Sequence, residues 1–347
     1  MQKKTINSGK ITQRKKDHLR IATSQVSQTG DNGFLRYRFV HNALPEINFD
    51  DIDLSTTFLG KKVNYPFFIS CMTGGVAEGL KINRNLARAA QKHGIAMGVG
   101  SQRAAVEHPE LAKLFMAREV APDIPLIANV GLVQLNYGFT YKEFQKCVDM
   151  IRADALAVHI NPIQEVIQPE GDRNFNNLLP KLSKLIDKVT VPIIAKEVGF
   201  GISYSVAEKL YRAGVRIIDS AGWGGTSWSV VEGERRDGFQ ELGRLFGQWG
   251  IPSSDSIIEV KRLASEKKDL LVLGSGGIRN GIEIAKAISL GADLVGLAQP
   301  FAQAGLVSEE RVEMLISKLA YELKVAMFGV GVKNIEELKK VKLIKSL

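Results

Sequence analysis

The sequence has 347 residues, of which 45% are hydrophobic and 24% are charged, and it carries a formal net charge of +9. These proportions are typical of a globular protein and exclude an intrinsically disordered chain. No apolar run reaches the roughly 20 residues that cross a bilayer, and the basic start lacks the apolar stretch of a secretory signal, so we expect no membrane partner.

The net charge limits which kinds of partner are expected, and the number of cysteines indicates the cellular compartment. A net charge of +9 is compatible with nucleic acid, an anionic membrane or a small anionic substrate. Lysine and arginine concentrate only at 10–20 and 333–345, without the interleaved aromatic residues typical of a nucleic-acid surface. We therefore expect no nucleic-acid partner, and we interpret the C-terminal lysines as a solvated helix face. Cys71 and Cys147 provide neither a disulfide framework nor metal-ligand spacing, so a cytoplasmic protein is expected.

From residue 67 onward a short apolar run is followed by a helical stretch, and this unit recurs eight times. The runs lack the alternation of half-buried strands, which indicates parallel strands buried on both faces. They lie at 67–72, 95–100, 125–130, 155–160, 192–197, 216–221, 270–275 and 293–298, and helices are predicted at 82–93, 177–189, 205–214, 255–267 and 281–291. Eight such units predict a closed (β/α)8 TIM barrel of the α/β class, with an open doubly wound sheet as the alternative.

The remaining segments do not follow this repeat. Residues 1–66 are expected to form an N-terminal extension that packs on the barrel at 67–347, and 34–47 within it reads as extended. Residues 222–254 form a long insertion after the sixth strand, rich in glycine and aromatic residues. We expect a structureless loop there, either an active-site lid or disordered. The chain from about 309 reads as helical.

Polar residues follow several of the predicted strands. In a barrel the loops after the strands converge on one mouth, where the chemistry takes place. The fifth strand ends in Lys196, whose burial is costly unless it faces an anion. The other strand ends supply Ser101, Gln102, Arg103, Asn129, His159, Asn161, Gln164, Glu165, Ser220, Thr226, Ala298 and Gln299.

The seventh strand leads into a glycine-rich stretch, Ser275-Gly276-Gly277-Ile278-Arg279-Asn280-Gly281. Backbone N–H groups at a helix N-terminus bind phosphate, and barrels commonly bind phosphate after strands seven and eight. Together with Lys196 and with Gly74-Gly75 after the first strand, this stretch indicates a phosphorylated planar cofactor. FMN is the simplest choice, because the chain has no GxGxxG motif for a dinucleotide.

These motifs resemble the type 2 isopentenyl-diphosphate delta-isomerases over nearly the whole chain. The glycine-rich pieces are shared with other FMN barrels, whereas the start at 14–18 and the loop at 159–165 are far more specific. The resemblance rests on RKKDH (14–18), HNALPE (41–46), MTGG (72–75), GSQR (100–103), HINPIQE (159–165), KE (196–197), GGTSW (224–228) and SGGIR (275–279).

The resemblance implies interconversion of isopentenyl and dimethylallyl diphosphates with reduced FMN and Mg2+, NADPH as reductant and a homo-oligomer of four or eight subunits. The N-terminal extension would contribute substrate-binding residues, and its RKKDH motif (14–18) would reach the mouth of either its own or a neighbouring subunit. FMN would be lined by Met72, Thr73, Gly74, Ser101, Asn129, Lys196, Ser220, Thr226, Gly277, Ile278, Arg279, Ala298 and Gln299. The diphosphate substrate would face Arg14, Lys15, Ser101, Gln102, Arg103, His159, Asn161 and Gln164, the last three with catalytic roles, and Glu165 would hold Mg2+.

Three other functions are weighed against this one. An FMN-dependent 2-hydroxy-acid oxidase needs a histidine base and an arginine after the sixth strand, and the loop at 220–225 has neither. A nucleotide monophosphate dehydrogenase needs a loop cysteine as nucleophile, and neither Cys71 nor Cys147 is predicted in such a loop. A non-enzymatic basic barrel that binds anions or RNA would need no flavin and would bind with a steep salt dependence.

Overall fold

The computed structural model describes residues 8–72 and 77–345. Its centre is a closed barrel of eight parallel strands in the order β10-β11-β4-β5-β6-β7-β8-β9. The strands are β4 (Phe67–Ile69), β5 (Met97–Gly98), β6 (Leu126–Gly131), β7 (Ala155–Ile160), β8 (Ile193–Glu197), β9 (Ile217–Asp219), β10 (Leu271–Ser275) and β11 (Leu294–Leu297). Each lies within or across one predicted apolar run, so the prediction of a closed barrel is confirmed and the open sheet is excluded.

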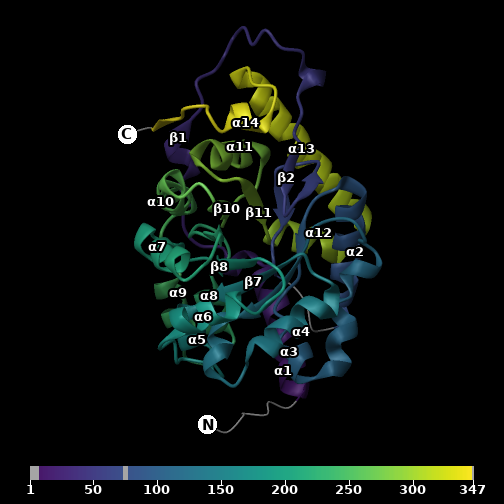
Figure 1. Ribbon diagram of the computed structural model, residues 1–347, viewed down its shortest axis with the longest axis vertical. Coiled ribbons are helices and arrows are strands. Elements are labelled where there is room, and N and C mark those ends of the chain that lie inside the picture. The colour runs from purple at the N-terminus through teal and green to yellow at the C-terminus, as the bar shows by residue number, and fades with distance from the viewer. Residues whose placement is uncertain (1–7, 73–76, 346–347) are drawn as a thin grey trace.

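Helices surround the barrel and cover the outer face of its strands (Figure 1). Their ends follow local sequence rules. Thr140 and Glu143 form a capping box at the start of α4, and Asn280 accepts a hydrogen bond from the Glu283 N–H at the start of α11. The helices of this layer are α2 (Ala77–His93), α4 (Tyr141–Ile151), α6 (Leu178–Ile186), α7 (Tyr204–Arg212), α10 (Ser253–Glu266), α11 (Gly281–Leu290), α12 (Gln299–Val307) and α13 (Glu309–Val330). The short helices α3 (Arg103–Glu107) and α5 (Pro162–Ile167) lie instead at the carboxyl ends of the strands.

A hairpin seals the end of the barrel where the strands begin. It consists of β2 (Thr56–Phe58) and β3 (Lys61–Val63). Phe58 and Val63 are buried in one cluster with inward-facing barrel residues such as Phe68. The Lys61 ammonium lies 2.7 Å from the carboxylate of Asp154, which directly precedes β7. The opposite end of the barrel, where the strands finish, therefore remains available for a site.

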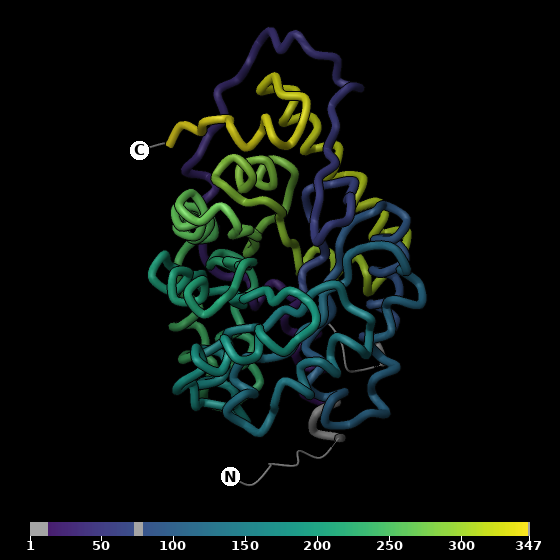
Figure 2. The backbone as a smooth tube through the Cα atoms, viewed as in Figure 1, coloured from purple at the N-terminus to yellow at the C-terminus, as the bar shows by residue number. Residues whose placement is uncertain are grey.

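The N-terminal extension runs along the molecule. It begins with α1 (Ser8–Ala22) beside α3 and reaches β1 (Tyr37–Arg38) at the other end (Figure 1). There β1 pairs antiparallel with β12 (Ile344–Lys345), and the following segment arches beyond the C-terminal helices (Figure 2). None of the described helices combines the length and apolar content needed to cross a bilayer.

Two expectations about irregular segments are wrong. The insertion at 222–254 contains α8 (Trp228–Glu234) and α9 (Gln240–Phe246), which pack on each other. A side chain on Gly233 would lie 2.9 Å from the Gly243 Cα, so glycine permits this close crossing. The C-terminal lysines do not share one helix face, because α14 (Ile335–Leu338) has only four residues and β12 follows it.

Candidate active site

A cavity opens at the carboxyl ends of the strands, where the loops after all eight strands meet. Helix α1 and the start of α8 also line it. In the barrel order, β10 and β11 lie opposite β6 and β7. The glycine-rich loop after β10 therefore faces the polar loop after β7 across the cavity.

The loop after β10 is the side of the cavity suited to a phosphate. Gly276 and Gly277 have φ angles of 110° and 67°, and a side chain on Gly277 would lie 2.0 Å from the Gly224 carbonyl oxygen. Only glycine permits this approach of two loops. The Arg279 guanidinium donates to the Ile278 carbonyl at 3.1 Å and to the Gln28 side chain. Burial lowers its pKa although the nearby Glu283 raises it, and arginine remains charged. A cation whose guanidinium has neutral hydrogen-bond partners therefore lines the cavity.

Lys196 occupies the floor of the cavity. It is buried, and its ammonium lies 2.7 Å from the Asp219 carboxylate. The Ser275 hydroxyl donates to the same carboxylate at 2.6 Å. The anion that a buried lysine requires is therefore partly supplied by the neighbouring strand β9. The Ser220 hydroxyl next to Asp219 is buried and has no hydrogen-bond partner within the described part of the chain.

The opposite side of the cavity is cationic. Arg14 lies 3.7 Å from Glu170, and Arg103 pairs with Glu107 at 2.9 Å and with Asp172. Within residues 8–72 and 77–345, the hydrogen-bond acceptor of the Lys15 ammonium is the Ser101 carbonyl, at 3.5 Å. Burial, together with Arg14 and Arg103, lowers the pKa of Lys15 to about 7. Arg14 and Arg103 are paired with carboxylates, whereas the hydrogen-bond partner of Lys15 is a neutral carbonyl, so Lys15 is the cation here best suited to an anionic ligand.

His159 lies beside these cations as a neutral ring. Its Nδ1 is 2.8 Å from the Asn129 Oδ1, and an amide oxygen can only accept, so Nδ1 carries the proton. Burial, with Lys15, Lys196 and Arg103 nearby, lowers the pKa of His159 to about 3. The Nε2 lone pair of His159 is therefore free to accept a hydrogen bond.

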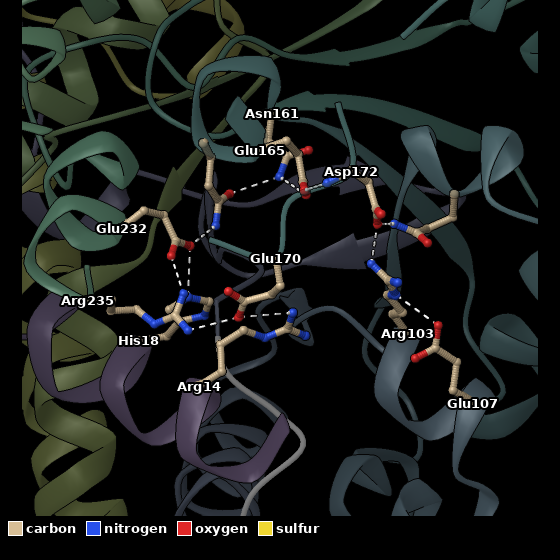
Figure 3. Close-up of polar contacts among 12 residues, drawn as sticks. Arg14, His18, Arg103, Glu107, Asn161, Glu165, Glu170, Asp172, Glu232 and Arg235 are labelled. Carbon is tan, nitrogen blue, oxygen red and sulfur yellow. Dashed lines mark hydrogen bonds and ion pairs between the residues drawn. The ribbon is translucent and has the colours of Figure 1, made fainter. Parts of the chain in front are cut away.

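Gln164 is held in one orientation by Asn161 and Glu232, which come from two elements and are drawn in Figure 3. Its Oε1 accepts from the Asn161 amide at 3.0 Å, and its Nε2 donates to the Glu232 carboxylate at 2.8 Å. The His18 Nε2 lies 2.9 Å from the Glu232 carboxylate, and Arg235 pairs with Glu232. Burial alone would raise the pKa of Glu232, but His18 and Arg235 outweigh it and lower the pKa to about 2. The carboxylate is thus ionised and fixes the direction of the Gln164 amide.

Glu165 points into the same loop. Its carboxylate accepts from the Asn161 amide at 2.9 Å and from the Asp172 N–H at 2.6 Å. Burial raises its pKa despite these bonds. No group of three or more His, Cys, Asp or Glu side chains among residues 8–72 and 77–345 has the arrangement of a metal site.

The cavity gathers most of the residues predicted from the sequence. Thr73 and Gly74 lie outside the described residues. Gln102 and Ser220 are buried but do not line the cavity, and the Gln102 amide instead ties the end of β5 to β6 and α4 through Asn129 N and Cys147 O. The others line it: Arg14, Lys15, Met72, Ser101, Arg103, Asn129, His159, Asn161, Gln164, Glu165, Lys196, Thr226, Gly277, Ile278, Arg279, Ala298 and Gln299.

Several residues of the site were not assigned from the sequence. His18, Glu232 and Arg235 surround Gln164 without following a barrel strand. Two signals were present in the sequence: His18 follows Arg14 by four residues on α1, and Arg235 follows Glu232 by three at the end of α8. Such spacings put side chains on one helix face.

Unpaired buried atoms show where a ligand fits. The Arg14 Nε, the Gln134 Oε1, the Asn161 Oδ1 and the Arg235 Nε have no hydrogen-bond partner within the described part of the chain. All belong to the cationic side of the cavity or to the network around Gln164. Buried polar atoms are costly to leave unpaired, so these atoms indicate a polar ligand.

Comparisons with known proteins identify relatives over most of the chain. The model of the FMN-dependent dehydrogenase family matches residues 20–116 and 157–345. The isopentenyl-diphosphate delta-isomerase of Nostoc sp. is 51% identical over 339 residues, 96% of each chain. That of Rickettsia typhi is 47% identical over 335 residues, 96% of this chain and 97% of the relative.

Solved structures resemble the fold at lower identity. A lactate oxidase of Pediococcus acidilactici has a TM-score of 0.68 at 17% identity, covering 99% of this chain and 95% of the oxidase. A flavocytochrome b2 variant with bound pyruvate has a TM-score of 0.70 at 20% identity, covering 96% and 82%. At such identities the similarity concerns the fold alone. The match to the family model and the 51% identity to a full-length relative show that this chain belongs to the FMN-dependent dehydrogenase family and, within it, to the isopentenyl-diphosphate delta-isomerases.

Proposed function

We propose that this protein interconverts isopentenyl and dimethylallyl diphosphates with bound, reduced FMN. The reaction adds a proton at one carbon and removes one at another, so the double bond moves without net redox change. The observation that supports it best is the pairing of a glycine-rich phosphate loop with a cationic wall across one cavity. Such a cavity offers a separate binding side to each of two phosphorylated groups.

FMN would take the side of the cavity formed by β10 and β11. Gly277, Ile278 and Arg279 would receive its phosphate with Thr226 and Gln299, and Lys196 lies on the floor below. The neutral hydrogen-bond partners of Arg279 support this placement. Reduced FMN would supply the group that exchanges protons with the substrate, while the protein supplies position and charge.

The diphosphate would lie against Arg14, Lys15 and Arg103, which come from α1 and from the loop after β5. All three belong to the same chain as the cavity, so the N-terminal basic motif acts on its own subunit in this proposal. Guanidinium groups bind phosphate oxygens in pairs, and lysine adds a point charge. Ser101 and the neutral His159 would complete the polar contacts.

Glu165 would hold Mg2+ beside the diphosphate. Mg2+ prefers oxygen ligands and keeps several waters, so one carboxylate with substrate oxygens and water suffices. Removal of Mg2+ by a chelator is therefore expected to weaken substrate binding. NADPH as the reductant of FMN, a homo-oligomer of four or eight subunits and a cytoplasmic location are further proposals, supported by the family resemblance alone.

Gln164 is the side chain that we place nearest the reacting carbons. Its amide is held between Asn161 and Glu232, so it presents a fixed edge to the cavity. A side-chain amide that can rotate by 180° presents either its NH2 donors or its oxygen acceptor, whereas the two hydrogen bonds restrict the Gln164 amide to a single orientation. The proposed role of Gln164 is to orient the substrate and the transferred proton.

The test is an isomerisation assay with purified protein, FMN, Mg2+ and isopentenyl diphosphate. We expect dimethylallyl diphosphate only when the flavin has first been reduced. If flavin binds but no product forms under either condition, the proposed FMN site would be retained and isopentenyl diphosphate would be rejected as the substrate. An oxidase is not favoured, because the loop at 220–225 offers no histidine base and no arginine.

A further inference from the structure

The segment at 23–32 crosses the side of the cavity that we assign to the FMN phosphate. The Thr29 N–H donates to the Gly225 carbonyl at 3.0 Å, and the Ser227 N–H donates to the Ser27 carbonyl at 2.8 Å. The Asn32 amide donates to the Gly277 carbonyl at 2.9 Å. The N-terminal extension is therefore bonded to both loops on which the cofactor phosphate would rest.

Gln28 lies at the centre of this crossing, with its side chain between two residues of the cavity wall. Its Nε2 donates to the Thr226 hydroxyl at 3.0 Å and to the Ser27 hydroxyl at 3.2 Å. Its Oε1 accepts from the Arg279 guanidinium. A guanidinium has only donors, so the amide has a single possible orientation.

This orientation determines what Thr226 offers to the cavity. A hydroxyl has one proton and two lone pairs. The Gln28 amide occupies a lone pair of Thr226, so the proton of the hydroxyl is left to donate to an anion. The same amide holds the Arg279 guanidinium through a neutral oxygen rather than through a carboxylate, so the guanidinium keeps donors for a phosphate. Both effects favour a phosphate at Thr226 and Arg279.

We propose that Gln28 is a positioning residue of the FMN phosphate site, which sets the Thr226 hydroxyl and the Arg279 guanidinium as donors to the phosphate. The assignment rests on the proposed placement of FMN. Gln28 itself does not line the cavity, so it acts through its two neighbours. It adds a residue of the N-terminal extension to a site otherwise built from barrel loops.

The experiment compares FMN with riboflavin, which lacks the phosphate. Flavin-free protein is titrated with each ligand, and the dissociation constant is measured from flavin fluorescence. For Gln28→Ala we expect the FMN constant to rise about tenfold, the loss typical of a hydrogen bond to a charged group. The riboflavin constant should stay within about twofold of the wild type, because riboflavin has no phosphate for Thr226 and Arg279 to bind.

A second variant tests the effect of a negative charge at position 28 without changing the size of the side chain. Gln28→Glu keeps the size of the side chain but would pair with Arg279 and accept the Thr226 proton. It should therefore weaken FMN more than Gln28→Ala, again without affecting riboflavin. Gln25→Ala, an exposed position in the same segment, serves as the matched control and should bind both flavins like the wild type.

Two results would overturn the assignment. One is an unchanged FMN constant in both Gln28 variants while the wild type binds FMN. The other is an equal weakening of FMN and riboflavin, which would indicate a general loosening of the segment. Failure of the wild type to bind FMN would overturn the proposed cofactor site and the role of Gln28 with it.

Discussion

Lys15 is the cation of the cavity with the weakest protein partner, a carbonyl at 3.5 Å. Its lowered pKa of about 7 means that it gains or loses its proton near neutral pH. The protonated form binds an anion, and its population falls as the pH rises through about 7. The net charge of the site therefore changes with pH near neutrality, where the enzyme is expected to act.

This predicts a pH dependence of anion binding. The affinity for inorganic diphosphate should fall by up to about tenfold for each pH unit above 7, because binding then requires uptake of one proton. Calorimetric titration between pH 6 and pH 9 measures it. Lys15→Arg, which stays protonated throughout, should remove most of the fall. An identical slope in that variant would assign the titrating group elsewhere.

Gln164 gives a second prediction at this scale. Gln164→Ala should lower the turnover number by about a hundredfold, since misplacement of reacting groups has effects of this size. The FMN content, measured by flavin absorbance, should not change, because Gln164 faces the substrate side. A variant that retains the wild-type rate would exclude a catalytic role for Gln164.

Most residues of the site could be predicted because each follows a barrel strand, and strand ends converge by geometry. Glu232 could not be predicted in this way. It lies on a short helix of the insertion, and its importance comes from contacts with Gln164 and with His18, over 200 residues earlier in the chain. Neither contact leaves a local pattern in the sequence.

At the scale of elements, the N-terminal helix α1 is attached to the insertion through Glu232. The His18 Nε2 of α1 lies 2.9 Å from this buried carboxylate, and Arg235 at the end of α8 pairs with it. Arg235 also pairs with Glu170 at 2.9 Å, to which Arg14 of α1 is linked. The helix that brings Arg14 and Lys15 to the cavity is therefore anchored by the network that orients Gln164.

Removal of the Glu232 carboxylate should weaken the attachment of α1 to the insertion. Glu232→Ala is expected to lower the free energy of unfolding by about 3–5 kcal/mol, the typical effect of breaking a buried ion pair. Denaturant unfolding measures the loss. The matched control is Glu234→Ala, since Glu234 pairs with the exposed Arg244 and should contribute less than about 1 kcal/mol. Equal losses in the two variants would contradict a special role for Glu232.

The helices of the insertion also show why length limits prediction. Helices α8 and α9 have seven residues each, too few for an apolar period to be recognised. Their stability comes from packing on each other, where Gly233 and Gly243 allow close approach. Glycine, which reads as a loop signal in the sequence, here permits the contact that stabilises the helices.

At the scale of the whole molecule, the eight strands could be predicted almost completely. Each is buried on both faces, so its sequence is continuously apolar and ends where the chain becomes polar. The hairpin that seals the other end was not predicted, because strands β2 and β3 have three residues each. Its Phe58 is 3% exposed and packs against Phe68 inside the barrel.

The packing of the β2–β3 hairpin against the end of the barrel is expected to contribute measurably to the free energy of unfolding. Phe58→Ala should lower the free energy of unfolding by about 3–5 kcal/mol, the range for truncating a buried aromatic side chain. Thr57→Ala, exposed on the same strand, should have an effect within about 0.5 kcal/mol. FMN binding should persist in both, because the cavity lies at the opposite end. Loss of FMN in Phe58→Ala without loss of stability would contradict this separation of the two ends.

The most direct test of the proposed isomerase is turnover in deuterated water with the flavin spectrum recorded throughout. Protein with reduced FMN, Mg2+ and isopentenyl diphosphate should yield dimethylallyl diphosphate that carries solvent deuterium, while the flavin remains reduced. Protein with oxidised FMN should yield none. Product without deuterium, stoichiometric oxidation of the flavin, or equal turnover with oxidised FMN would contradict a proton transfer that uses reduced FMN without net redox change.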